Sequence, residues 1–393
     1  MEKQKKFVDE LDKKKKDKKK ITIYVIIFMA VLAAFFGGFF GAPYIGVLLN
    51  QPINMVRVLF YLAFTVFICY CAAIFHVVLH EAGHLIFGLI TGYQFISFRI
   101  FSYIWIKEEG KITRKRFSLA GTGGQCIMSP PPLKEGKIPY LWYNLGGVLA
   151  NVFVSLLLMF FYYYFKPRGF WGEVLLLTFM VGFILALLNG IPLNNGELLN
   201  DGYNIVAIGR SSMSMYAFWL QLKIMEEMAK KKRLKDLPKD WFISLKEEEM
   251  NNVMVTTISV FACNRLLDLK EMEQTKEKIE YLLGANIKMA GIHKILLKID
   301  LLYLTLIFSH NQEEISRIYT KELKKYMKQL HSLLPVMRTE YAYALLIDKD
   351  LQKAEKMKER FEKAASKYPY PQEVLGEREL MEEAEALYHK REE

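Results

Sequence analysis

Two histidines and a glutamate form the strongest chemical signal in the sequence. His80, Glu81 and His84 stand in the pattern H-E-x-x-H within an otherwise apolar stretch. On a helix, residues four positions apart share one face, so both imidazoles can bind one ion while Glu81 takes a proton from water. Zn2+ accepts such ligands and activates water. Because charged and polar side chains are costly in lipid and mark functional sites there, we expect a zinc site with His80 and His84 as ligands and Glu81 as general base.

A catalytic zinc ion usually has a third protein ligand. Asp201 can supply a carboxylate oxygen from a Gly- and Pro-rich break after a later apolar run, and Glu197 in the same break is a rival. Asn189, at the end of that run, offers an amide that can hold a substrate carbonyl. His76 lies one turn before His80. It can assist a ligand, face a pore or be a buried side chain without a chemical role, and we favour the last.

The distribution of charge indicates a membrane protein. The 393-residue chain has a net charge of +11, and residues 1–20 and 92–140 each contribute +5. Both blocks flank apolar runs long enough to cross a bilayer. The expected spans are about 21–41, 55–90, 141–165 and 170–188. The positive-inside rule then places both basic blocks and both chain ends in the cytoplasm of a multi-pass protein of the cell membrane. Nucleic-acid binding, which needs a basic face on a folded module, is disfavoured.

Together these motifs resemble the site-2 protease family of intramembrane zinc metalloproteases. That family pairs an H-E-x-x-H in one membrane helix with N-x-x-P and D-G in a later one. The matching residues, over about 55–205, are His80, Glu81, His84, Asn189, Pro192, Asp201 and Gly202, and Gly147–Asn151 resembles the family's G-P-x-x-N element. The chain departs from the family at Val148, which replaces Pro, and in a Pro192-to-Asp201 spacing about four residues longer than usual, which keeps Glu197 as a rival.

The resemblance implies an activity. We expect residues 21–230 to form a membrane-embedded zinc metalloprotease domain that hydrolyses a peptide bond within or next to the transmembrane segment of a membrane protein or peptide precursor. Residues 1–20 of the chain precede this domain as a Lys-rich cytoplasmic tail. The alternative is a catalytically inactive membrane scaffold that binds partners through its cytoplasmic domain.

A strand-rich segment follows the histidines. Residues 93–106 and 112–120 favour two strands joined by a turn, and the resemblance implies a small sheet close to the active site. The free edge of such a sheet can bind an extended substrate by strand addition. The other interpretation is a juxtamembrane hairpin with no role in substrate binding.

The remainder, 231–393, has balanced charges and helical patterns. Its segment Phe361–Pro369 resembles the second helix of a tetratricopeptide hairpin, with Tyr341–Ala344 in the helix before it; a plain array of helical hairpins is the alternative. Either arrangement predicts a docking surface for a protein partner. The expected fold is therefore mainly α: a polytopic helical bundle of about four spans with a small juxtamembrane β-hairpin, followed by a cytoplasmic all-α domain of helical hairpins.

Overall fold

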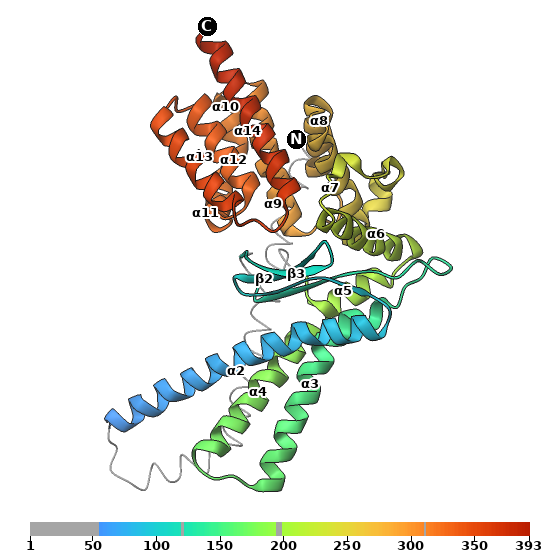
Figure 1. Ribbon diagram of the computed structural model, residues 1–393, viewed down its shortest axis with the longest axis vertical. Coiled ribbons are helices and arrows are strands. Elements are labelled where there is room, and N and C mark those ends of the chain that lie inside the picture. Colours follow the sequence, from blue (N-terminus) through green and yellow to red (C-terminus); the bar gives the residue numbers. More distant parts are fainter. Residues whose placement is uncertain (1–54, 119–121, 194–198, 310–311) are drawn as a thin grey trace, which may run out of the picture. The chain divides into compact units, whose positions relative to one another are not determined.

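The computed structural model describes residues 55–118, 122–193, 199–309 and 312–393. The chain is mainly helical and contains one small antiparallel sheet (Figure 1). Residues 55–74 and 154–184 form one compact unit, and residues 75–153 and 185–393 form another. The Lys-rich tail and the first predicted span, 21–41, lie outside the described residues, so the four-span count stays a prediction.

Within the described residues, three helices are long and apolar enough to cross a membrane, as the sequence predicted for these segments. They lie in α2 (Met55–Ile90), α3 (Tyr140–Phe165) and α4 (Phe170–Gly190). The candidate spans have 28, 26 and 21 residues, and about 20 residues suffice to cross the hydrocarbon core. Large apolar side chains such as Phe67 and Phe153 are exposed on these helices, which is the expected arrangement where lipid replaces water.

The end of α3 follows from local sequence. Pro167 comes two residues after Phe165, and the residue before a proline is disfavoured in helical conformation. Lys166 and Gly169 both adopt positive φ, 47° and 63°, which reverses the chain within four residues. The helix α4 then starts at Phe170.

The sheet has four strands, where the sequence predicted two. They are β1 (Gln94–Ile100), β2 (Tyr103–Glu108), β3 (Lys111–Arg116) and β4 (Gly124–Ser129), in the spatial order β3-β2-β1-β4. The single strand expected over 93–106 divides because Phe101 adopts a positive φ of 50° and turns the chain. The strand β4, which the sequence did not reveal, pairs antiparallel with β1 from Gly124 opposite Ile100 to Ser129 opposite Gln94. Both β3 and β4 are therefore edge strands among the described residues.

The rest of the chain is helical. The α-helices are α5 (Asp201–Ile208), α6 (Ser212–Ala229), α7 (Val253–Asp268), α8 (Met272–Gly284), α9 (Gly291–Phe308), α10 (Gln312–Ile318), α11 (Lys321–Gln329), α12 (Leu334–Leu346), α13 (Leu351–Ala365) and α14 (Pro371–Glu392). Three short 3-10 helices, Leu234–Asp236, Lys239–Trp241 and Glu247–Met250, connect α6 to α7.

The helix α9 lies at the centre of this helical region. Its Leu302, Leu304 and Leu306 are fully buried, and a helix that is apolar on several faces must be surrounded by other helices. The pair α12 and α13 forms a hairpin that contains Tyr341–Ala344 in its first helix and Phe361–Ala365 in its second. The predicted helices are thus confirmed, whereas the tetratricopeptide family stays a prediction.

Candidate metal site

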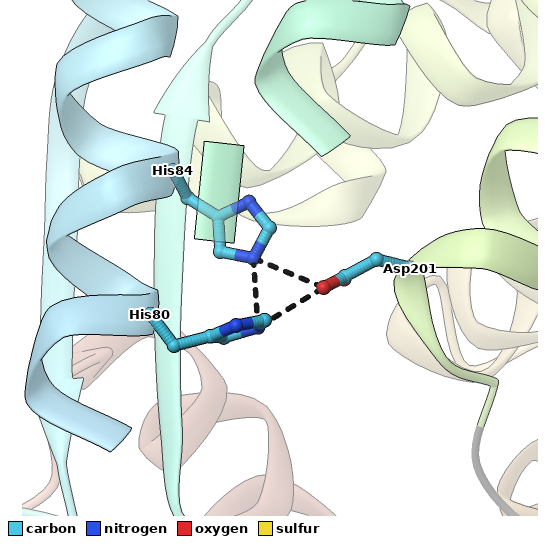
Figure 2. Close-up of side chains that lie close together, drawn as sticks. All are labelled: His80, His84 and Asp201. Carbon is cyan, nitrogen blue, oxygen red and sulfur yellow. Dashed lines mark hydrogen bonds and ion pairs between the residues drawn. The ribbon is translucent and has the colours of Figure 1, made fainter. Parts of the chain in front are cut away.

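Three side chains with lone pairs converge beside α2. The Nε2 atoms of His80 and His84 lie 3.2 Å apart, and Oδ2 of Asp201 lies 3.0 Å from the first and 3.3 Å from the second. Figure 2 shows that the two histidines project from one helix and that Asp201 reaches them from the start of another. Residues more than a hundred positions apart in sequence therefore form one compact cluster, and it is the only such group of possible metal ligands within the described part of the chain.

One hydrogen bond fixes a proton on the ring of His84. Its Nδ1 lies 2.7 Å from the backbone carbonyl oxygen of Tyr143, and because a carbonyl only accepts hydrogen bonds, Nδ1 carries the proton. In the neutral imidazole, Nε2 then presents a lone pair toward a second imidazole nitrogen and a carboxylate. Either a second proton on this ring or a metal ion among the three atoms turns this repulsion into attraction. A backbone carbonyl that holds the other ring nitrogen is also the usual support of a metal-binding histidine.

The spacing of the three atoms fits zinc. A triangle with sides of about 3.2 Å has corners about 1.8 Å from its centre, so all three atoms could contact one ion with bonds of about 2.0–2.2 Å. Two imidazoles and a carboxylate are one of the ligand sets that catalytic zinc uses. All the donor atoms in the group lie within 4.8 Å of one another. The residues present therefore fit a zinc ion.

The charge of Asp201 agrees with a ligand role. Burial raises the pKa of its carboxyl, but the close contacts with His84 and His80 outweigh burial and hold the pKa below its ordinary value. The carboxylate is thus ionised at neutral pH, and ionised carboxylate is the form that binds a metal. The side chain is 17% exposed, so the site keeps limited access to solvent.

Glycines on α3 create the space for the histidines. The backbones of α2 and α3 approach so closely at Gly83 and Gly146 that a Cβ on either residue would collide with the other's carbonyl group. One residue further along, Gly147 lies against the imidazole of His80. Small residues at a crossing of membrane helices permit this close approach. Gly146 thus lets the two helices approach, and Gly147 leaves room for the imidazole of His80.

Asn200 places Asp201. Its side-chain oxygen accepts hydrogen bonds from the backbone nitrogens of Leu193 and Tyr203, at 3.1 and 3.0 Å, which caps α5. Its amide nitrogen donates to the carbonyls of Leu188 and Ile191 at the end of α4, at 2.7 and 2.6 Å. The side chain therefore connects the end of one helix to the start of the next. Sequence reasoning missed this residue, although an Asn at a helix start is a standard capping signal.

Gly202, the residue after Asp201, lies at a close contact between two helices. A Cβ on Gly202 would collide with the backbone carbonyl of Gly190, the last residue of α4. The start of α5 therefore lies directly against the end of α4. This contact gives a physical meaning to the D-G pair in the sequence. Glu197 lies outside the described residues, so the preference for Asp201 as ligand stays a prediction.

Glu81 is buried beside strand β4. It is only 8% exposed, and its Oε1 would lie 2.5 Å from a Cβ built on Gly124. Arg99 holds this end of the strand: its guanidinium donates to the carbonyls of Phe101 and Gly124, both at 3.0 Å, and to the hydroxyl of Thr122. Arg99 is 1% exposed. Sequence reasoning counted Arg99 only as a basic residue and missed this role.

The remaining predicted residues lie as follows. The amide nitrogen of Asn189 donates to the carbonyl of Leu185 in its own helix, at 3.1 Å, so its role in substrate binding stays a prediction. His76 is fully buried, as expected, and its Nδ1 lies 3.1 Å from Oδ1 of Asn151. This bond joins α2 to the last residue of the Gly147–Asn151 element.

Comparison with protein-family models, curated proteins and solved structures finds no match to this chain.

Proposed function

We propose that this chain is an intramembrane zinc metalloendopeptidase that cleaves a peptide bond within or next to the transmembrane segment of a membrane protein or peptide precursor. One observation carries the proposal: His80, His84 and Asp201 converge within 3.3 Å beside a helix long and apolar enough to cross a membrane. Two imidazoles and a carboxylate are expensive in such surroundings, and binding an ion offsets that cost.

The chemistry follows from the residues beside the ion. Bound zinc would polarise the scissile carbonyl and make water a stronger nucleophile. Glu81 accepts the proton of the attacking water and passes it to the leaving amine. Its burial beside Gly124 keeps the carboxylate close to the reacting atoms. The amide of Asn189 gives up its hydrogen bond to the carbonyl of Leu185 and donates to the substrate carbonyl instead, which orients the substrate.

Strand β4 presents the substrate. A transmembrane helix hides its carbonyls in its own hydrogen bonds, so the substrate has to unwind before hydrolysis. Among the described strands, β4 is at the edge of the sheet, and its first residue, Gly124, lies against Glu81. An extended substrate that adds to this edge gains backbone hydrogen bonds and brings a peptide bond toward Glu81.

The membrane arrangement completes the proposal. The chain crosses the cell membrane several times with both ends in the cytoplasm, which follows from the positive-inside rule applied to residues 1–20 and 92–140. The helical region 231–393 binds a protein partner on the same side. It then brings cytoplasmic proteins close to the peptidase without contributing to the chemistry.

A pair of variants tests the proposal. Purified wild-type protein should contain close to one zinc ion per chain, Glu81→Gln should retain it, and His80→Ala should lose it. The membrane proteome of the protein's own cell is then incubated with wild type or with Glu81→Gln, and new peptide termini are identified by mass spectrometry. Termini inside or beside transmembrane segments are expected with wild type alone. Equal cleavage by Glu81→Gln would exclude the mechanism, and a zinc-free wild-type protein would favour the scaffold.

A further inference from the structure

A cavity of about 420 Å³ lies in the second unit, apart from the metal site. Its wall is formed by β4, α6, α7, α9, α12 and α14, and apolar side chains such as Met225, Leu296 and Leu334 contribute to it. Cavities of this size bind small organic molecules, with a few polar groups that select among them. The charged residues of the wall therefore indicate what this cavity can accept.

Most charges in the wall are already paired. Asp268 is bound by Arg233, and the buried Arg338 lies 2.6 Å from Asp300 and 2.9 Å from Glu377. One guanidinium therefore lies between both of these acids and balances part of their charge. Lys232, which also lines the cavity, pairs with Glu227 at 2.6 Å.

Glu373 is the exception. It lines the cavity, and the partner that the described residues give its carboxylate is the hydroxyl of Tyr368, at 3.0 Å. Burial raises the pKa of Glu373 to about 7, and the hydrogen bond from Tyr368 opposes burial only in part. A partly buried carboxylate without a positively charged side chain beside it is costly, so a cation that enters the cavity would be stabilised there.

A second polar group in the cavity wall has a nitrogen atom that makes no hydrogen bond with the described residues. Nδ1 of His293 is buried and has no hydrogen-bond partner among the described residues. Burial lowers the pKa of this imidazole to about 4, so it is neutral and adds no positive charge. The cavity therefore combines an acid, a neutral hydrogen-bonding ring and apolar walls.

We propose that this cavity binds a small organic cation, a primary ammonium or guanidinium on an apolar stem, with the charged end against Glu373. The apolar walls and the volume favour an organic stem over a bare metal ion. Such a group can belong to a free amine or to a Lys or Arg side chain of a peptide. The proposal concerns a site other than the metal cluster and does not depend on peptidase activity.

Binding by the full-length protein in lipid nanodiscs tests the proposal. The probes are phenethylamine, phenethyl alcohol as its uncharged counterpart, and a blocked tripeptide with a central lysine between two leucines. Titration calorimetry should give saturable binding of an ammonium probe with Kd of about 10 µM to 1 mM, in the range of small ligands. The alcohol should bind about tenfold to a hundredfold more weakly, since a charged hydrogen bond is lost. Tighter binding of the free amine or of the tripeptide distinguishes the two sources.

Two matched variants complete the experiment. Glu373→Gln should weaken binding of the ammonium probe about tenfold or more, whereas Glu382→Gln, an exposed position on the same helix, should leave it unchanged. Thermal unfolding of both variants verifies that they fold. The comparison of amine and alcohol binding to the wild-type protein tests the proposal even if a variant does not fold. Equal binding of amine and alcohol, no saturable binding of either ammonium probe, or an unaffected folded Glu373→Gln variant would overturn the proposal.

Discussion

The imidazole of His80 occupies the space that any side chain at Gly147 would need. A Cβ on Gly147 would lie 2.6 Å from ring atoms Cε1 and Nδ1, far inside van der Waals contact. The ligand and the glycine come from different helices, α2 and α3. The position of the proposed zinc ligand His80 therefore depends on a residue that cannot itself bind metal.

The substitution Gly147→Ala should displace His80 and weaken zinc binding about tenfold to a hundredfold, as losses of support around a metal ligand do. Competition with a chromogenic chelator measures the affinity. Gly284→Ala is the matched control, because a Cβ there meets open space. Unchanged zinc affinity in Gly147→Ala would mean that the ring of His80 moves aside without cost.

A glycine on the other side of the site should separate zinc binding from cleavage. Gly124→Ala places a methyl group against the carboxylate of Glu81 and leaves His80, His84 and Asp201 in place. We expect peptide cleavage to fall by about 10²- to 10⁴-fold, the usual contribution of a positioned general base, with zinc content unchanged. Peptide turnover and metal analysis on the same preparation provide both readouts. Joint loss of zinc and activity would contradict this division of roles.

Loss of the Asn200 side chain should weaken zinc binding by moving Asp201. Asn200→Ala removes a helix cap, which costs about 0.5–2 kcal/mol, together with its bonds to the end of α4. Ser211→Ala is the matched control, since Ser211 caps α6 through the backbone nitrogen of Ser214. Both variants should lower thermal stability, and only Asn200→Ala should lower zinc affinity. Equal zinc affinities in the two variants would show that α5 holds Asp201 without its cap.

The buried acid of the cavity should give stability a distinct pH dependence. Burial raises the pKa of Glu373 from 4.5 to about 7, so the folded state holds its proton more tightly than the unfolded chain. The resulting stability is complete below the unfolded value and is lost as pH rises through about 7. Glu373→Gln should therefore stabilise the protein relative to wild type at about pH 8 by up to about 3 kcal/mol, and by much less at about pH 5.

Chemical denaturation at both pH values measures this difference. Glu382→Gln, exposed on the same helix, should show the same stability relative to wild type at both. A Glu373→Gln effect of equal size at the two pH values would contradict the predicted titration.

Sequence reasoning found the parts of the site that lie within one segment. The four-residue spacing of His80 and His84 is a helical property, so their shared face could be predicted before any packing was known. Asp201 lies in a distant segment, but it could be proposed as the third ligand because Gly and Pro break the helix before it. The bonds from Asn200 to the end of α4 and the space left by Gly147 depend on contacts between segments, and no local pattern records them.

The sheet was predicted only in part for a related reason. The segment 93–106 is rich in strand-forming residues throughout, and the turn at Phe101 requires a positive φ that Phe rarely adopts. Here hydrogen bonds outside the turn support it: the backbone nitrogen of Phe101 donates to the carbonyl of Gly123 at 2.8 Å, and its carbonyl accepts from Arg99. Tertiary contacts therefore decided what local propensity could not.

Strand β4 belongs to two environments at once. Because side chains alternate along a strand, Gly124 and Met128 contact α2 at Glu81 and Gly88, whereas Gln125 and Ile127 line the cavity. Adjacent residues of β4 face opposite sides, so a single peptide unit separates a residue at the cavity from a residue at α2. The same six residues therefore form part of the cavity wall and of the packing around Glu81, so a change in the position of this strand would alter both.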